Sequence, residues 1–104
     1  MDLGLRGRTA LITGGSKGIG LSIAKFLAAE GCALHLVSRI AADLDAARAL
    51  LLQAHEVPIR VHPMDLAARG SAQALASRVR DLDILVNNAG STPRGTLLEV
   101  DEER

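Results

Sequence analysis

The residues best suited to chemistry form a glycine-rich turn near the N-terminus, and the chemistry that they favour is phosphate binding. The segment from Thr13 to Gly20 reads TGGSKGIG and joins an apolar, β-branched run to a stretch with helical periodicity. A strand, a glycine turn and a helix in this order point several backbone N–H groups and the positive end of a helix dipole at one spot. Glycine is needed there because a side chain would keep a pyrophosphate away from the backbone.

The spacing of the glycines separates this turn from two common phosphate-binding motifs. Gly14, Gly18 and Gly20 give the order G-x-x-x-G-x-G, which is not the dinucleotide fingerprint G-x-G-x-x-G. Lys17 precedes Gly18 instead of following it, so the turn is not a Walker P-loop either. A purely structural turn before a helix has the same composition. Other motifs in the chain must therefore decide whether this turn binds phosphate or is only a structural turn.

The other residues that could carry chemistry predict no metal or redox site. His35, His55 and His62 lack metal-ligand spacing and have no second cysteine to join them. Cys32 is the only cysteine, which excludes an internal disulfide, and we expect it to be a small core residue.

Composition indicates one cytoplasmic domain. The chain has 104 residues and no net charge, with twelve acidic and twelve basic side chains, which argues against a nucleic-acid or membrane-surface partner. No apolar run approaches the roughly 18 residues of a membrane helix, and the N-terminal residues lack the apolar core of a signal peptide.

The elements that must position the turn are four apolar strands alternating with three helices. The expected strands are residues 9–13, 33–37, 59–62 and 83–87, and the expected helices are residues 18–29, 41–55 and 71–80. Continuous apolar strands indicate a parallel sheet covered on both faces. Right-handed crossovers and nucleotide binding at the switch point then give the strand order 3-2-1-4, one half of a doubly wound α/β sheet.

Finer expectations concern the helix faces and the chain ends. The predicted apolar faces are Ile19, Ile23, Ala24, Leu27 and Ala28 on the first helix, and Ile40, Leu44, Ala47 and Leu51 on the second. Gly31 is expected to cap the end of the first helix and Ser71 the start of the third. A helix start is expected near Leu97, and the fourth strand is expected to be an unpaired edge of the sheet.

Two motifs at the ends of the first and fourth strands carry a family resemblance. TGGSKGIG, together with NNAG from Asn87 to Gly90, resembles the short-chain dehydrogenase/reductase family, and the match extends in order over nearly the whole chain. The resemblance implies that residues 1–104 are the N-terminal portion of a Rossmann-type, NADP(H)-binding domain. It also implies hydride transfer between a nicotinamide and a carbonyl or alcohol substrate, with a homo-oligomer for the full-length protein.

The resemblance also implies which residues contact the cofactor. Those expected to line the pyrophosphate and adjoining ribose are Gly14, Ser16, Lys17, Gly18, Ile19 and Gly20. Those expected beneath the ribose on the nicotinamide side are Asn88, Ala89 and Gly90. Asp65 would accept a hydrogen bond from the adenine amino group, with Leu66 beside the ring. An alternative for Asp65 is a turn or helix-capping aspartate.

The residues that follow the second strand predict which nicotinamide cofactor is preferred. An acid there would bind the ribose 2′-OH and repel a 2′-phosphate, but this chain has Ser38-Arg39. Arg39 can pair a phosphate through two N–H groups, and Lys17 could add a second positive charge. The sequence therefore predicts NADP(H) rather than NAD(H). The alternative is that Arg39 is a solvated residue at a helix start.

No residue of the chain is assigned a catalytic role. The family uses a serine, a tyrosine and a lysine four residues after the tyrosine, and this chain contains no tyrosine. The chain is therefore interpreted as the cofactor-binding part of an oxidoreductase. Two alternatives stay open: a nucleotide-binding module without catalysis, and a structural fragment.

Overall fold

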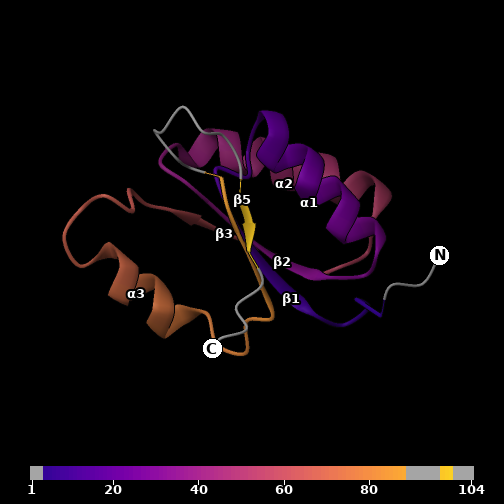
Figure 1. The fold of residues 1–104 in the computed structure, drawn as a ribbon. Coiled ribbons are helices and arrows are strands. Elements are labelled where there is room, and N and C mark those ends of the chain that lie inside the picture. The colour runs from indigo at the N-terminus through magenta and orange to yellow at the C-terminus, as the bar shows by residue number, and fades with distance from the viewer. Residues whose placement is uncertain (1–3, 89–96, 100–104) are drawn as a thin grey trace.

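The computed structural model describes residues 4–88 and 97–99 and shows a five-stranded sheet with helices on both faces (Figure 1). Its elements are β1 (Thr9–Thr13), α1 (Gly18–Ala29), β2 (Ala33–Ser38), α2 (Ala41–Ala54), β3 (Ile59–Pro63), α3 (Ser71–Arg78), β4 (Ile84–Asn87) and β5 (Leu97–Glu99). The strand order is β3-β2-β1-β4-β5, and β1 to β4 pair in parallel. This confirms the Rossmann-type α/β fold and the predicted order 3-2-1-4.

β5 corrects two expectations about the C-terminal part of the chain. The residues from Leu97 form a strand instead of a helix start, and this strand pairs antiparallel with β4, with Val86 opposite Leu98. β4 is therefore not the edge of the sheet. A three-residue strand is too short to show a period in the sequence. Its position depends on the row of backbone N–H and C=O groups that β4 offers at its free side.

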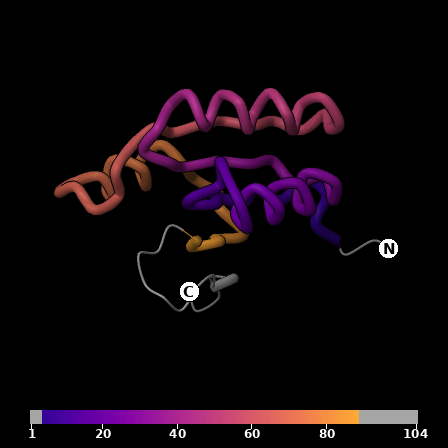
Figure 2. Tube along the Cα trace, turned by 90° about the horizontal axis from the view of Figure 1, so that it is seen from above, coloured from indigo at the N-terminus to yellow at the C-terminus, as the bar shows by residue number. Residues whose placement is uncertain are grey.

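The helices divide the core into two layers. α1 and α2 cover one face of the sheet and α3 covers the other, as both ribbon and trace show (Figures 1 and 2). Ile12, Leu36 and Val86 lie in register on the first face with no exposed surface. The buried cluster on the second face consists of Leu11, Val37, Leu75 and Val79. No described helix has the length and apolar character that a membrane span requires.

Two isoleucines assigned to apolar helix faces are exposed instead. Ile19 and Ile40 keep 60% and 52% of their surface accessible, whereas the other residues predicted for these faces are buried or pack against the core. Ile19 is the second residue of α1, and Ile40 is the N-cap of α2. A residue at the end of a helix has fewer neighbours to cover it, so the 3.6-residue period overestimates burial there.

Glycines with positive φ lie at the end of α1 and at the start of α3. Gly31, with φ +89°, comes directly after the C-cap residue of α1. Its N–H donates to the carbonyl of Ala28 at 3.0 Å, and the N–H of Cys32 donates to that of Leu27 at 3.0 Å, which is a Schellman motif. At the start of α3 the N-cap is Gly70, with φ +83°, and not the predicted Ser71. The left-handed backbone that this turn requires is accessible to glycine without strain.

A histidine pair joins β2 to β3 on the face covered by α3. Nδ1 of His35 lies 2.9 Å from Nε2 of His62, and the two rings stack with centroids 5.1 Å apart. Burial lowers the pKa of both side chains, and the nearby Arg60 lowers both further; His35 and Arg78 also lower the pKa of His62. The described residues hold no group of three or more potential ligands that would suit a metal ion. A hydrogen bond between the two ring nitrogens requires at least one neutral ring, because a doubly protonated imidazole cannot accept.

We expect this histidine pair to make the fold sensitive to mild acid. The unfolded histidines bind protons below about pH 6.5, whereas the folded ones have a lower pKa and stay neutral. Stability is then fully present above pH 6.5 and is lost as the pH falls through the folded pKa values. Chemical denaturation at pH 7.5 and pH 5.5 measures this loss. His62→Gln should reduce the pH dependence of the free energy of unfolding, whereas His55→Gln, a substitution outside the pair, is the control. An unchanged pH dependence in His62→Gln would show that the histidine pair is not its cause.

Candidate nucleotide-binding site

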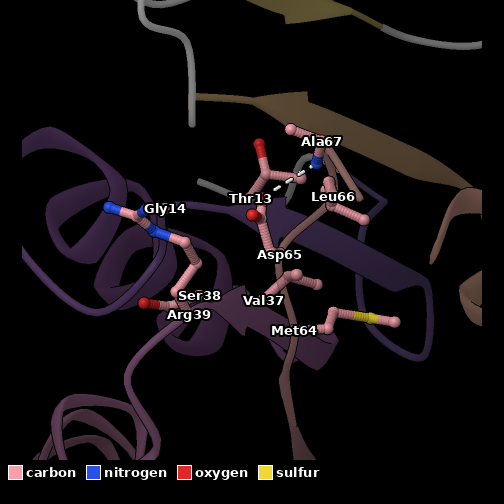
Figure 3. Close-up of a pocket in the computed structure, with 9 residues that line it drawn as sticks. All are labelled: Thr13, Gly14, Val37, Ser38, Arg39, Met64, Asp65, Leu66 and Ala67. Carbon is pink, nitrogen blue, oxygen red and sulfur yellow. Dashed lines mark hydrogen bonds between the residues drawn. The ribbon is translucent and has the colours of Figure 1, made fainter. Parts of the chain in front are cut away.

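A cavity of about 430 Å³ opens where β1, β2 and β3 end (Figure 3). It is lined by Thr13, Gly14, Val37, Ser38, Arg39, Met64, Asp65, Leu66 and Ala67. Its volume lies within the roughly 300–1,000 Å³ of small-molecule sites. Ligands of open α/β sheets bind outside the carboxyl ends of the strands, which is where this cavity lies.

The glycine turn forms one wall of the cavity and leads directly into α1. Gly14 has φ +67°, and its N–H donates to the carbonyl of Val37 at 2.8 Å, which ties the turn to β2. Gly18, with φ +57°, begins α1 after Lys17, the extended N-cap residue. Among the described residues, no side chain caps the first turn of α1. Its N–H groups and the positive end of the helix dipole are therefore available to an anion.

Gly20 is required by close packing and not by its backbone angle. A Cβ atom at this position would lie 2.7 Å from Nδ2 of Asn88 and would overlap the carbonyl oxygen of Gly14. The same amide group of Asn88 donates to that carbonyl at 3.4 Å. The third glycine of the motif thus lets the first turn of α1 approach both the glycine turn and the end of β4.

The residues after β2 place a positive charge at the cavity. The Ser38 hydroxyl oxygen accepts a weak hydrogen bond from the N–H of Ile40 at 3.4 Å. Arg39 is exposed, lines the cavity, and makes no hydrogen bond or ion pair with any residue that the structure describes. In Figure 3 its side chain lies on one side of the cavity, opposite Leu66. An arginine without an internal partner retains its full capacity to bind a phosphate.

The residues after β3 line another part of the cavity. Oδ1 of Asp65 accepts a hydrogen bond from the N–H of Ala67 at 2.9 Å (Figure 3). This contact is the local turn that the sequence left as an alternative for Asp65, and it uses one of the two carboxylate oxygens. Leu66 and Met64 also pack against the buried cluster under α3. This part of the cavity therefore combines a carboxylate with apolar side chains.

Thr13 joins the end of β1 to the end of β4. Its side chain is buried, and its hydroxyl accepts from the N–H of Asn88 at 2.8 Å. The hydroxyl hydrogen faces two acceptors, Oδ1 of Asn87 at 3.2 Å and the carbonyl of Val86 at 3.4 Å. These contacts fix the glycine turn relative to β4. Ala89 and Gly90, the last two predicted site residues, lie outside the described residues.

Comparison with known proteins identifies the family. The family model described as short chain dehydrogenase matches residues 8–104. The chain belongs to the short chain dehydrogenase family.

Relatives in this family include sugar reductases. L-xylulose reductase of Mesocricetus auratus is 41% identical over 104 residues, which cover 99% of this chain and 40% of that protein. The crystal structure of L-sorbose reductase from Gluconobacter frateurii in complex with NADPH and L-sorbose matches with a TM-score of 0.82 and 38% identity, over 99% of this chain and 41% of that one. The Pseudomonas aeruginosa RhlG/NADP complex has a TM-score of 0.72 and 39% identity, over 86% of this chain and 37% of that one. The chain thus spans about 40% of the length of its relatives.

The structure brings five of the predicted residues together around the cavity: Gly14, Ser38, Arg39, Asp65 and Leu66. The other described ones lie in the turn, in the first turn of α1 or at the end of β4, and do not line it: Ser16, Lys17, Gly18, Ile19, Gly20 and Asn88. The sequence analysis missed four lining residues: Thr13, Val37, Met64 and Ala67. Thr13 ends β1, Val37 is the last residue but one of β2, and Met64 and Ala67 lie in the loop after β3. The ends of the predicted strands were therefore the available signal.

Removing the Thr13 hydroxyl should loosen the contact between the glycine turn and β4. Thr13→Val removes the part-buried hydrogen bond from the N–H of Asn88 to the hydroxyl, which we expect to lower the free energy of unfolding by about 1–3 kcal/mol. Chemical denaturation measures this change. Thr13→Ser keeps the oxygen and serves as the control with a smaller loss. A Thr13→Val variant as stable as Thr13→Ser would contradict the proposed role of the hydroxyl.

Proposed function

We propose that this chain is the cofactor-binding part of an NADP(H)-dependent oxidoreductase that transfers hydride between the nicotinamide and a carbonyl or alcohol substrate. The observation that carries the cofactor preference is Arg39, a cation at the cavity that has no partner in the described part of the chain, where an NAD-binding site would have an acid. Two relatives described as complexes with NADPH or NADP support the same choice.

The residues present fit a dinucleotide. Gly20 keeps the first turn of α1 against the glycine turn, where an added Cβ would collide, and the N–H groups of that turn suit a pyrophosphate. Arg39 would pair the 2′-phosphate, with Ser38 beside it. Asp65 would accept a hydrogen bond from the adenine amino group through its second oxygen, with Leu66 against the ring. Asn88, with Ala89 and Gly90 after it, would run beneath the nicotinamide ribose.

The bound nicotinamide would supply or accept the hydride, and the chain's own residues bind and orient it. None of the described residues is assigned to proton transfer, in keeping with a chain that contains no tyrosine. Two of the relatives, L-xylulose reductase and L-sorbose reductase, are named for sugars, and a small carbonyl or alcohol compound is the proposed substrate class. A homo-oligomer and a cytoplasmic location belong to the same proposal.

Titration of the full-length protein with NADP⁺ and NAD⁺ tests the cofactor assignment. We expect tighter binding of NADP⁺, since the two ligands differ only in the 2′-phosphate that Arg39 would contact. Equal affinities would refute the preference. Turnover of NADPH with L-xylulose or L-sorbose, monitored by the absorbance of the reduced nicotinamide, tests the reaction class. Binding without turnover of any carbonyl substrate would favour the module without catalysis.

A further inference from the structure

Lys17, the cation of the glycine turn, already has a partner. Nζ of Lys17 lies 3.3 Å from Oδ2 of Asp43. Lys17 is the N-cap residue of α1, and Asp43 belongs to the first turn of α2. The ion pair thus bridges the starts of the two helices that leave the carboxyl ends of β1 and β2, next to the cavity wall formed by the glycine turn.

The two cations near the predicted 2′-phosphate therefore differ in their surroundings. Arg39 has no partner among the described residues, whereas the charge of Lys17 is shared with a carboxylate. Lys17 keeps 74% of its side chain exposed, whereas Asp43 is only 28% exposed and lies on a helix. An acidic side chain in the first turn of a helix interacts favourably with the helix dipole. A phosphate that uses Lys17 must share the lysine with this fixed anion.

We propose that Asp43 is a specificity-determining residue, which lowers the affinity of the site for the 2′-phosphate by competing for Lys17. This inference rests on the proposed use of a nicotinamide dinucleotide. Its physical basis is that one ammonium group carries one charge, so a bound carboxylate reduces the net attraction for a second anion. Exposed ion pairs have modest strength, so removing the competitor should tighten NADP⁺ binding by about two- to fivefold.

The test compares NADP⁺ and NAD⁺ affinities in the full-length protein, before and after Asp43→Asn. Asparagine preserves the size of the side chain and removes its charge. We expect the ratio of NADP⁺ to NAD⁺ affinity to rise two- to fivefold, with little change for NAD⁺. Asp45→Asn is the matched control, because it removes the same charge from an exposed position on the same helix that forms no described ion pair. Melting temperatures of each variant identify any loss of folding.

A double-mutant cycle shows whether the effect passes through Lys17. In a Lys17→Met background, Asp43→Asn should no longer raise the ratio of NADP⁺ to NAD⁺ affinity, because the carboxylate and the phosphate then have no ammonium group to compete for. A change in ratio that persists in this background would overturn the competition and leave only direct repulsion. A purely structural role of Asp43 would change both affinities equally.

The outcomes separate this inference from the proposed function. If the wild-type protein prefers NADP⁺ and Asp43→Asn leaves or lowers the ratio, the inference is wrong and the function stands; a lowered ratio would mean that Asp43 orients Lys17 for the phosphate. If the wild-type protein shows no preference but Asp43→Asn creates one through Lys17, the inference stands and the cofactor preference is wrong. Absence of binding to either dinucleotide would overturn both.

Discussion

Replacing Arg39 by aspartate is expected to weaken NADP⁺ binding by about a hundredfold or more and to reverse the cofactor preference. The substitution removes a charge-assisted contact worth about 1.5–3 kcal/mol and adds repulsion between a carboxylate and the 2′-phosphate. NAD⁺ lacks that phosphate, and an acid after β2 can accept a hydrogen bond from its ribose 2′-OH. Affinity for NAD⁺ should therefore hold or increase.

Calorimetric titration of both cofactors against Arg39→Asp measures this reversal. Arg80→Asp is the matched control, because it makes the same change of charge at an exposed residue away from the cavity. It corrects for the altered net charge of the protein. An unchanged NADP⁺ preference in Arg39→Asp would show that Arg39 is a solvated residue at a helix start. The proposed function would then lose the observation that carries it.

Gly20→Ala is expected to destabilise the protein by about 1–3 kcal/mol, although alanine is normally the better helix former. In an ordinary helix this exchange stabilises by about 1 kcal/mol. Here the new Cβ would overlap the carbonyl oxygen of Gly14 and lie 2.7 Å from Nδ2 of Asn88. These neighbours belong to the turn and to the end of β4, so relief requires a backbone shift.

Dinucleotide affinity should fall with the same substitution, by about tenfold or more, because the shift displaces the N–H groups that face the pyrophosphate. Denaturation and NADP⁺ titration measure the two effects. Ser22→Ala is the control, since it places alanine on the exposed side of the same helix without a new contact. A Gly20→Ala protein that is more stable than the wild type would show that helix propensity outweighs packing at this position.

The order of the elements could be predicted from the sequence because it depends on local patterns. Apolar runs of four to six residues, helical periods and glycines at turns are properties of neighbouring residues. They predicted β1 to β4 and α1 to α3 within a few residues. The parallel order 3-2-1-4 then followed from general rules of chain connection. The strand ends also located the site, since Gly14, Arg39 and Asp65 each follow a predicted strand.

Features that join distant parts of the chain depended on the three-dimensional arrangement. The pairing of β5 with β4, the contact of His35 with His62 and the ion pair of Lys17 with Asp43 each require atoms far apart in sequence to meet. Whether such groups meet is decided by the register of the strands and the packing of the helices. The sequence thus determined the fold, the glycine turn that is proposed to bind phosphate, and the position of Arg39 after β2, because each depends on the types of neighbouring residues. Tertiary packing determined how strongly Lys17 can attract a ligand phosphate, because the fold places the carboxylate of Asp43 beside its ammonium group.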